Sequence, residues 1–280
     1  MGDLGTDTAV TPRADGGYTA TLRPEWAIWG PNGGYLASVA LRAAGLATGR
    51  ARPASVLVHF LGVAAFHDVT IETTVLRSSR YATSLRVELA QDGRPVLEAL
   101  VWGVDEPPVA LIHDQTVKPD VPPPEHVASF DERMASSGEV APFPFWANLE
   151  HRPVDWAETW PPAEPLGPEQ RWWCRFRPTA KFAEPWLDAC RLLIPLDTSG
   201  WPAATLPHAP RSPLDVMAPT VDLSVRFHRP TDDEWVYCET VSPVGASGLV
   251  TATGRAWDRA GRLLASGEQT MLCRPAPPPG

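Results

Sequence analysis

A carboxylate and an amide stand among apolar residues in the second half of the chain. Asp197 follows the apolar run 192–196, and Gln269 shares one face of a predicted strand with Leu263 and Ala265. Burying a carboxylate without partners is costly, and a buried amide should find hydrogen-bond partners. One chemistry that meets both needs is general-base catalysis, in which Asp197 takes a proton from a water that Gln269 helps to hold. The structural alternatives are an aspartate at a solvent-reaching helix end and a glutamine bonded to sheet backbone.

A pair of glycines far upstream is placed to stabilise negative charge. Pro31, Asn32, Gly33 and Gly34 precede the apolar segment 35–47 and would form the N-terminal turn of a helix. Free backbone N–H groups and the helix dipole favour negative charge at such a turn, and glycine lets a ligand approach the backbone closely. The sequence therefore predicts a backbone donor for a developing oxyanion. The alternative is that the glycines only make a tight turn.

Bringing these distant segments together requires a fold that joins both halves of the chain, and an internal repeat predicts one. Residues 58–60 (VHF) correspond to residues 225–227 (VRF) with a shift of 167, and Gly93 corresponds to Gly261 with a shift of 168. The spacing between the two anchors therefore holds to one residue. Two copies of one helix-plus-sheet unit can form a pseudo-dimer with a site at the seam.

The period of the apolar residues predicts the elements of each copy. Residues 35–47 are apolar almost all round, which indicates a buried helix. The second helix is expected at 185–198, where Pro195 should kink or end it near Asp197. The strands expected in the first half are 55–61, 68–76, 82–90 and 94–103, the last after a hairpin turn at 92–93. Those expected in the second half are 171–177, 219–228, 234–242, 248–257 and 263–273, with a hairpin near 258–261.

Composition excludes several classes of function. The chain has 280 residues, 44% of them apolar, and a net charge of −9, which argues against a general nucleic-acid or membrane-surface binder. No apolar run reaches the roughly 20 residues that span a bilayer, and the polar start of the chain has no signal-peptide pattern, so we expect a cytoplasmic protein. The four cysteines have no CxxC spacing, and GxSxG, GxxxxGK[ST], GxGxxG and HExxH are absent from the sequence. We expect neither a metal nor a cofactor.

Several local motifs carry a resemblance to a known family. They are residues 30–44 (GPNGGYLASVALRAA), 58–64 (VHFLGVA), 221–230 (VDLSVRFHRP) and 264–272 (LASGEQTML), together with the two hairpins. Over about residues 20–105 and 145–273 the chain resembles the acyl-CoA thioesterase II family. The resemblance implies an α+β double hot-dog fold, in which each of two repeats wraps an antiparallel sheet around a central helix.

The resemblance also implies an activity and a set of catalytic residues. It implies hydrolysis of an acyl-CoA thioester to a free acid and CoA, by a water that an Asp, a Thr and a Gln jointly orient and activate. The matching positions are Asp197 in residues 196–203 (LDTSGWPA), Thr220 at the start of its strand, and Gln269 on the last strand. Threonine at a strand start is also common for its β-propensity alone.

Substrate-binding positions follow by analogy with single hot-dog dimers, whose sites combine the helix start of one unit with a side chain of the other. We expect Gly33, Gly34 and Tyr35 to face Asp197, with the amide of Gly34 or Tyr35 as the oxyanion donor. His59, where the family also has a histidine, completes the expected set. Its alternative is a position that faces solvent.

One working site per chain is expected. With shifts of 167 and 168, Thr220 falls over Pro53 and Gln269 falls over Val101, and neither first-half residue can do the polar task. Three arginines alternate along residues 171–177, where they either meet CoA phosphates or form a solvated strand face.

The predicted organisation is a first hot-dog unit at 1–110, a proline-rich connector at 111–150, a second unit at 151–275 and a tail at 276–280. Residues 126–170 are expected to hold short helical or irregular pieces. The expected partners are an acyl-CoA substrate and further copies of the chain in a homo-oligomer, with no nucleic acid and no membrane.

Two other functions remain open from the sequence. A hot-dog enoyl-thioester hydratase or dehydratase would need a histidine–aspartate pair at a helix, and neither predicted helix contains a histidine. A non-catalytic acyl-thioester binding protein would keep the same polar residues for structural reasons only.

Overall fold

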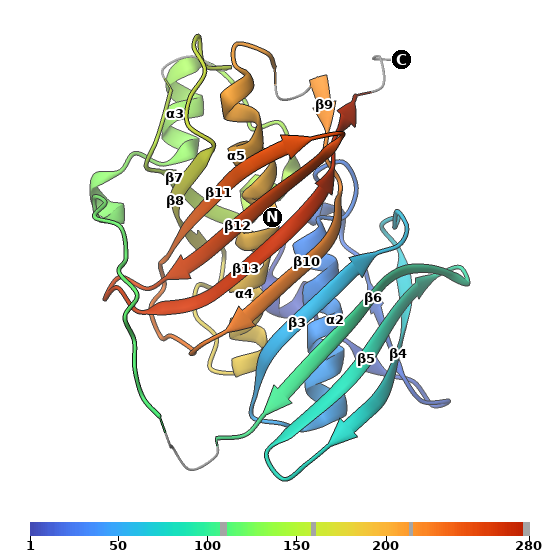
Figure 1. Cartoon of the computed structure of the whole chain (residues 1–280). Coiled ribbons are helices and arrows are strands. Elements are labelled where there is room, and N and C mark those ends of the chain that lie inside the picture. Colours follow the sequence, from blue (N-terminus) through green and yellow to red (C-terminus); the bar gives the residue numbers. More distant parts are fainter. Residues whose placement is uncertain (107–110, 158–160, 213–214, 277–280) are drawn as a thin grey trace.

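The chain folds as two similar halves, each with a central helix and a run of strands (Figure 1). The structure is a computed structural model and describes residues 1–106, 111–157, 161–212 and 215–276. The first half holds α1 (Leu4–Asp7), β1 (Thr11–Pro12), β2 (Tyr18–Thr21), the 3-10 turn η1 (Pro24–Trp26), α2 (Gly33–Thr48), β3 (Arg52–Phe60), β4 (Asp68–Ser78), β5 (Ala82–Gln91) and β6 (Arg94–Val104).

The remaining elements follow a connecting segment. That segment holds η2 (Pro124–His126), α3 (Phe130–Ser137) and η3 (Pro144–Asn148). The second half holds β7 (Leu149–Pro153), β8 (Glu169–Phe176), α4 (Pro185–Thr198), α5 (Gly200–Thr205), η4 (Leu206–His208), β9 (Val216–Met217), β10 (Thr220–Phe227), β11 (Val236–Ala246), β12 (Leu249–Trp257), β13 (Leu263–Leu272) and β14 (Arg274–Pro275). The predicted boundary at residue 110 and residues 277–280 of the predicted tail lie outside the described residues.

Among the described residues, twelve strands form one antiparallel sheet in the order β1-β2-β4-β5-β6-β3-β10-β13-β12-β11-β8-β7. The two strands that repeat one another in the sequence, β3 and β10, pair at its centre (Figure 1). Val56 lies opposite Val225 and Val58 lies opposite Leu223. The register relates the halves by an approximate twofold axis, because residues 56 and 58 of the first repeat correspond to residues 223 and 225 of the second. The predicted seam is therefore a continuous strand pairing.

Helix α2 is buried because its sequence is apolar on nearly every side, as predicted for residues 35–47. Its N-terminus is capped by the side chain of Asn32, which accepts a hydrogen bond from the N–H of Tyr35 at 3.0 Å. It ends at Thr48 and is followed by Gly49, whose φ of 60° is the left-handed conformation that glycine adopts at helix ends. Helix α2 lies against α4, and the sheet covers both. No described helix combines the length and the apolar character that crossing a bilayer requires.

Helix α4 begins at Pro185, as predicted, and Glu184 caps its first amides. The helix continues through Pro195 and ends at Thr198, the predicted last residue, so Pro195 does not end it. Pro195 lacks the N–H that would bond to the carbonyl one turn earlier. The chain turns at Ser199 and enters the short helix α5, which the sequence did not predict.

The sheet agrees with the sequence in its long strands and differs at its edges. All the strands predicted in each half are present, and Asp92 and Gly93 form the predicted hairpin turn, both with positive φ. Strand β2 next to β4 and strand β7 next to β8 were not predicted. Both are short and lack a clear apolar alternation, so their pairing is decided by the sheet edges that they cover.

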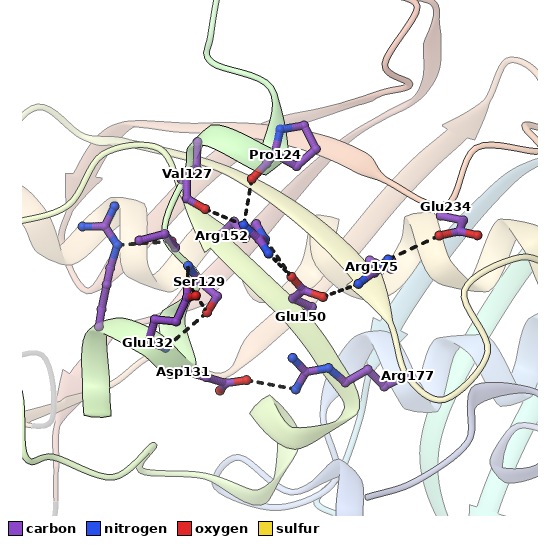
Figure 2. Close-up of polar contacts among 12 residues, drawn as sticks. Pro124, Val127, Ser129, Asp131, Glu132, Glu150, Arg152, Arg175, Arg177 and Glu234 are labelled. Atoms are coloured by element: carbon purple, nitrogen blue, oxygen red, sulfur yellow. Dashed lines mark hydrogen bonds and ion pairs between the residues drawn. The ribbon is translucent and has the colours of Figure 1, made fainter. Parts of the chain in front are cut away.

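The connecting segment is fixed to β7 by charged side chains (Figure 2). Glu150 accepts hydrogen bonds from Arg152 at 2.7 Å and from Arg175 at 2.6 Å. Arg152 also donates to the backbone carbonyls of Pro124 at 2.9 Å and Val127 at 2.8 Å. The proline-rich segment is therefore held against the second half around residues 124–127.

A buried ion pair holds α4 to the loops around it. Arg191 donates to Asp188 at 2.6 Å, and both side chains are almost fully buried. The same guanidinium donates to the backbone carbonyls of Ala180, Thr231 and Asp233. Burial raises the pKa of Asp188, while Arg191 opposes that rise. Removing one partner of such a pair leaves an uncompensated charge in the interior.

We predict that Arg191→Met lowers the free energy of unfolding by about 3–5 kcal/mol, because Asp188 and three carbonyls lose their donor. Urea denaturation followed by circular dichroism measures the change. Arg86→Ala is the matched control, since Arg86 forms an ion pair with Glu98 on the exposed face of the sheet. Its effect should stay within about 1 kcal/mol. Equal losses in the two variants would contradict a stabilising role for the buried pair.

Candidate active site

The carboxylate of Asp197 lies at the C-terminal end of α4 and points at the N-terminus of α2. Its Oδ2 accepts a hydrogen bond from the backbone N–H of Gly34 at 2.7 Å. Its Oδ1 accepts one from the hydroxyl of Thr220 at 3.0 Å. The side chain is 6% exposed. The two antiparallel helices of the pseudo-dimer therefore meet at this carboxylate, and both halves of the chain supply its donors.

Gln269 lies on β13, on the face of the sheet that α4 covers. Its Nε2 donates to the carbonyls of Leu196 at 2.9 Å and Asp197 at 3.0 Å, which are among the last carbonyls of α4 and lack helical partners. These two bonds fix the orientation of the amide. Its Oε1 lies 3.3 Å from the hydroxyl of Thr220, at the start of β10. The structure therefore brings Asp197, Thr220 and Gln269 together.

Two glycines allow α4 to approach the sheet this closely. A Cβ at Gly200 would lie 2.7 Å from Cδ of Gln269 and closer still to its Nε2. A Cβ at Gly254 of β12 would lie 2.8 Å from Cδ2 of Leu196. Side chains at these positions would displace the amide or the helix end. Neither role is predictable from the sequence, since both depend on contacts between distant segments.

The N-terminus of α2 is also part of the site, and two of its first three backbone N–H groups already donate hydrogen bonds. The N–H of Gly34 donates to Asp197, and the N–H of Tyr35 donates to the side chain of Asn32. The N–H of Gly33 has no acceptor among the residues that the structure describes. A Cβ at Gly33 would lie 2.9 Å from Oδ2 of Asp197, so glycine is needed there for the close approach.

Two of the predicted substrate-binding side chains lie elsewhere. The ring of Tyr35 is buried and stacks on Trp26, and its hydroxyl donates to the carbonyl of Asp7. His59 is exposed on β3, while its neighbour Val58 is buried toward the helices. Because side chains alternate along a strand, His59 lies on the outer face of the sheet. The part of Tyr35 that belongs to the site is its backbone N–H, which donates to Asn32 beside Asp197.

The arginines of β8 and its C-terminal end are occupied by carboxylates. Arg171 pairs with Asp155, Arg175 pairs with Glu150 and Glu234, and Arg177 pairs with Asp131 (Figure 2 for the last two). The side chains lie on the strand face away from the helices, in agreement with the alternative of a solvated, ion-paired face.

Burial controls the acidity of Asp197. It raises the pKa of the carboxyl to about 6, and the hydrogen bonds from Gly34, Thr220 and Asn32 oppose that rise. No described residue forms an ion pair with Asp197, so neutral donors alone stabilise the charged form. A carboxyl with this pKa is largely ionised at neutral pH and remains a stronger base than an exposed aspartate.

At the other end of the helix pair, where the C-terminal part of α2 meets the N-terminus of α4, an aromatic ring occupies the space that corresponds to the Asp197 site. Counted from the N-cap of each helix, residues 33–46 of α2 have counterparts 152 positions later in α4. Gly34 then corresponds to Trp186, and Asp197 corresponds to Gly45. A Cβ at Gly45 would lie 2.8 Å from Cγ of Trp186. The carboxylate-to-amide contact of Asp197 with α2 therefore has no counterpart between Gly45 and α4.

Both halves of the chain match models of known protein domains. Residues 22–104 match the family model of the acyl-CoA thioesterase N-terminal domain, and residues 120–273 match that of the acyl-CoA thioesterase C-terminal domain. No curated protein matches the chain by sequence.

Solved structures share the fold at low identity. An acyl-CoA thioesterase II from Mycobacterium marinum is 19% identical, with a TM-score of 0.78 over 98% of this chain and 99% of that one. A tesB protein from Mycobacterium avium subspecies paratuberculosis is 21% identical, with a TM-score of 0.78 over 98% of both chains. A hot-dog-fold protein from Alicyclobacillus acidocaldarius is 21% identical, with a TM-score of 0.75 over 99% of both. The predicted α+β double hot-dog fold is confirmed.

The raised pKa of Asp197 predicts a pH-dependent stability difference from Asp197→Asn. A carboxyl with a higher pKa in the folded than in the unfolded chain favours folding below its unfolded pKa and loses that contribution as pH rises through its folded pKa. Wild type should therefore lose about 2 kcal/mol relative to the variant between pH 4 and pH 7. Urea denaturation of both proteins across this range measures it. A constant difference would contradict the raised pKa.

Proposed function

The chain belongs to the acyl-CoA thioesterase II-like family of double hot-dog proteins, and on this premise we propose that it hydrolyses an acyl-CoA thioester to a free acid and CoA. The observation that carries the proposal is the buried carboxylate of Asp197, which the hydroxyl of Thr220 contacts at 3.0 Å beside the amide of Gln269. A base and two groups that can orient a water are thus collected at one point of the seam.

In the proposed reaction, Asp197, Thr220 and Gln269 hold the attacking water. The Thr220 hydroxyl donates to Oδ1 of Asp197 and fixes the carboxylate, which accepts one hydrogen bond from the water. The Oε1 of Gln269 accepts a second hydrogen bond, since its Nε2 is fixed to the end of α4. Asp197 takes one proton as the water oxygen bonds to the thioester carbon. Collapse of the tetrahedral intermediate breaks the C–S bond, and the proton passes from Asp197 to the sulfur of CoA.

The thioester oxygen needs a donor as negative charge develops on it. The expected donors were the amides of Gly34 and Tyr35, which in this structure donate to Asp197 and Asn32. We assign the role to the N–H of Gly33, at the positive end of α2. One such donor contributes roughly 10²–10³ in turnover.

The geometry favours hydrolysis over the other hot-dog reactions. Enoyl-thioester hydration would need a histidine beside the carboxylate, and helices α2 and α4 contain none. Among the described residues, the groups that donate hydrogen bonds to the Asp197 carboxylate are the Gly34 amide, the Asn32 side chain and the Thr220 hydroxyl. A pure binding protein would show affinity for acyl-CoA without turnover.

We predict that Asp197→Asn lowers kcat by about 10²–10⁴-fold, because a general base contributes that much and the amide keeps the shape of the site. The assay follows release of the CoA thiol from short, medium, long and aromatic acyl-CoAs. Thr220→Val should also lose activity, since it removes the hydroxyl and keeps the volume. Unchanged turnover in Asp197→Asn would eliminate this residue as the base, and tight binding of acyl-CoA without turnover in wild type would favour the binding protein.

The same base predicts a pH profile. Asp197 must be ionised to accept the proton, so kcat/KM should rise about tenfold per pH unit up to about pH 6 and level off above it. Initial rates of thiol release between pH 4.5 and pH 8 measure the profile. An acidic limb near pH 4, as for an exposed aspartate, would be incompatible with a buried base.

A further inference from the structure

We propose that Asn32, in the first half of the chain, is a positioning residue that holds the Asp197 carboxylate at the N-terminus of α2 and has to be a neutral amide to do so. The inference rests on the proposed function. In the sequence, Asn32 lies in the predicted turn before α2, and its side chain has no predicted role in the chemistry.

Asn32 uses both ends of its side chain, and it is 5% exposed. Its Oδ1 caps α2 by accepting from the N–H of Tyr35 at 3.0 Å. Its Nδ2 reaches across the seam, 3.3 Å from Oδ2 of Asp197 and 3.2 Å from the hydroxyl oxygen of Thr198. The cap of the first-half helix is therefore also a donor to the end of the second-half helix.

The N-cap of the other helix shows what a different residue does. Glu184 occupies the equivalent position before α4, and its two carboxylate oxygens accept from the N–H groups of Trp186 and Leu187, both at 2.9 Å. This acidic cap therefore accepts hydrogen bonds from both backbone N–H groups and leaves neither for another acceptor. Asn32 takes only the N–H of Tyr35 and leaves the N–H of Gly34 free for Asp197.

Charge explains why the cap has to be neutral. The groups that face Asp197 are the Gly34 amide and the Asn32 side chain at the start of α2, Thr220 from β10 and Gln269 from β13. None of them is titratable, and no described charged side chain forms an ion pair with Asp197. An acidic cap would place a second carboxylate about 3.3 Å from the first, and two carboxylates this close retain a shared proton to higher pH.

The decisive variant is Asn32→Asp, which keeps the shape and the capping oxygen and changes only the amide. Aspartate caps helices as well as asparagine does, so the protein should fold. We expect the acidic limb of kcat/KM to move up by about one pH unit or more, so that activity at pH 6 falls about tenfold and recovers by pH 8.5. KM should change less than kcat. Asn32→Ser, which caps without reaching Asp197, should lose activity without recovering at high pH.

Glu184→Gln is the matched control, because it exchanges acid and amide at the equivalent cap, at the opposite end of the helix pair. It should leave the pH limb in place, whatever it does to stability. A limb that stays in place in Asn32→Asp, or that moves equally in Glu184→Gln, would overturn the inference.

A measurement without substrate separates this inference from the proposed function. The pH midpoint of the stability difference between Asp197 and Asp197→Asn is determined in the Asn32 chain and in the Asn32→Asp chain. An upward move of the midpoint supports the inference, and an unchanged midpoint overturns it. Wild-type protein that hydrolyses no acyl-CoA would instead end the proposed function.

Discussion

The site depends on burying one carboxylate between two antiparallel helices. Removed from water, the charge of Asp197 has to be balanced by hydrogen-bond donors, and the chain provides them from the N-terminus of α2, from β10 and from the cap of α2. An amide at a helix N-terminus is suited to this because its N–H has no partner within the helix and the helix dipole adds to its attraction for an anion. These donors hold the carboxylate with no counter-ion among the residues that the structure describes, and burial keeps it basic.

The same constraint explains why the two ends of the α2–α4 helix pair differ, although the two halves are related by an approximate twofold axis. The helix pair has two junctions, each between the first turn of one helix and the last turns of the other. At one junction a glycine faces a carboxylate, and at the other the glycine Gly45 faces the ring of Trp186. The difference in size distinguishes the two ends. The backbone amide of Gly34 reaches the carboxylate of Asp197, whereas the indole fills the equivalent space at the other end and donates to the carbonyl of Arg50.

Close approach of α4 to the sheet is the second condition. Gln269 reaches the last carbonyls of α4 because Gly200 has no side chain in the way, and Leu196 packs over Gly254. The amide then both completes the hydrogen bonding of the helix end and presents its oxygen to Thr220. The two hydrogen bonds from Gln269 to the carbonyls of Leu196 and Asp197 thus do two things. They give the last carbonyls of α4 a donor, and they orient the amide oxygen proposed to bind the water.

The sequence by itself determined the parts of this protein that follow from periodicity and local chemistry. The two apolar helices, the long strands, the hairpin at Asp92 and Gly93 and the repeat are local patterns, and the family resemblance singled out Asp197, Thr220 and Gln269. Only the tertiary structure decided which backbone amides remain available, that Asn32 reaches across the seam, and that His59 faces outward. These depend on how α2 and α4 cross and on which face of the sheet each strand presents. Contacts between residues more than a hundred positions apart are set by packing, which no local pattern contains.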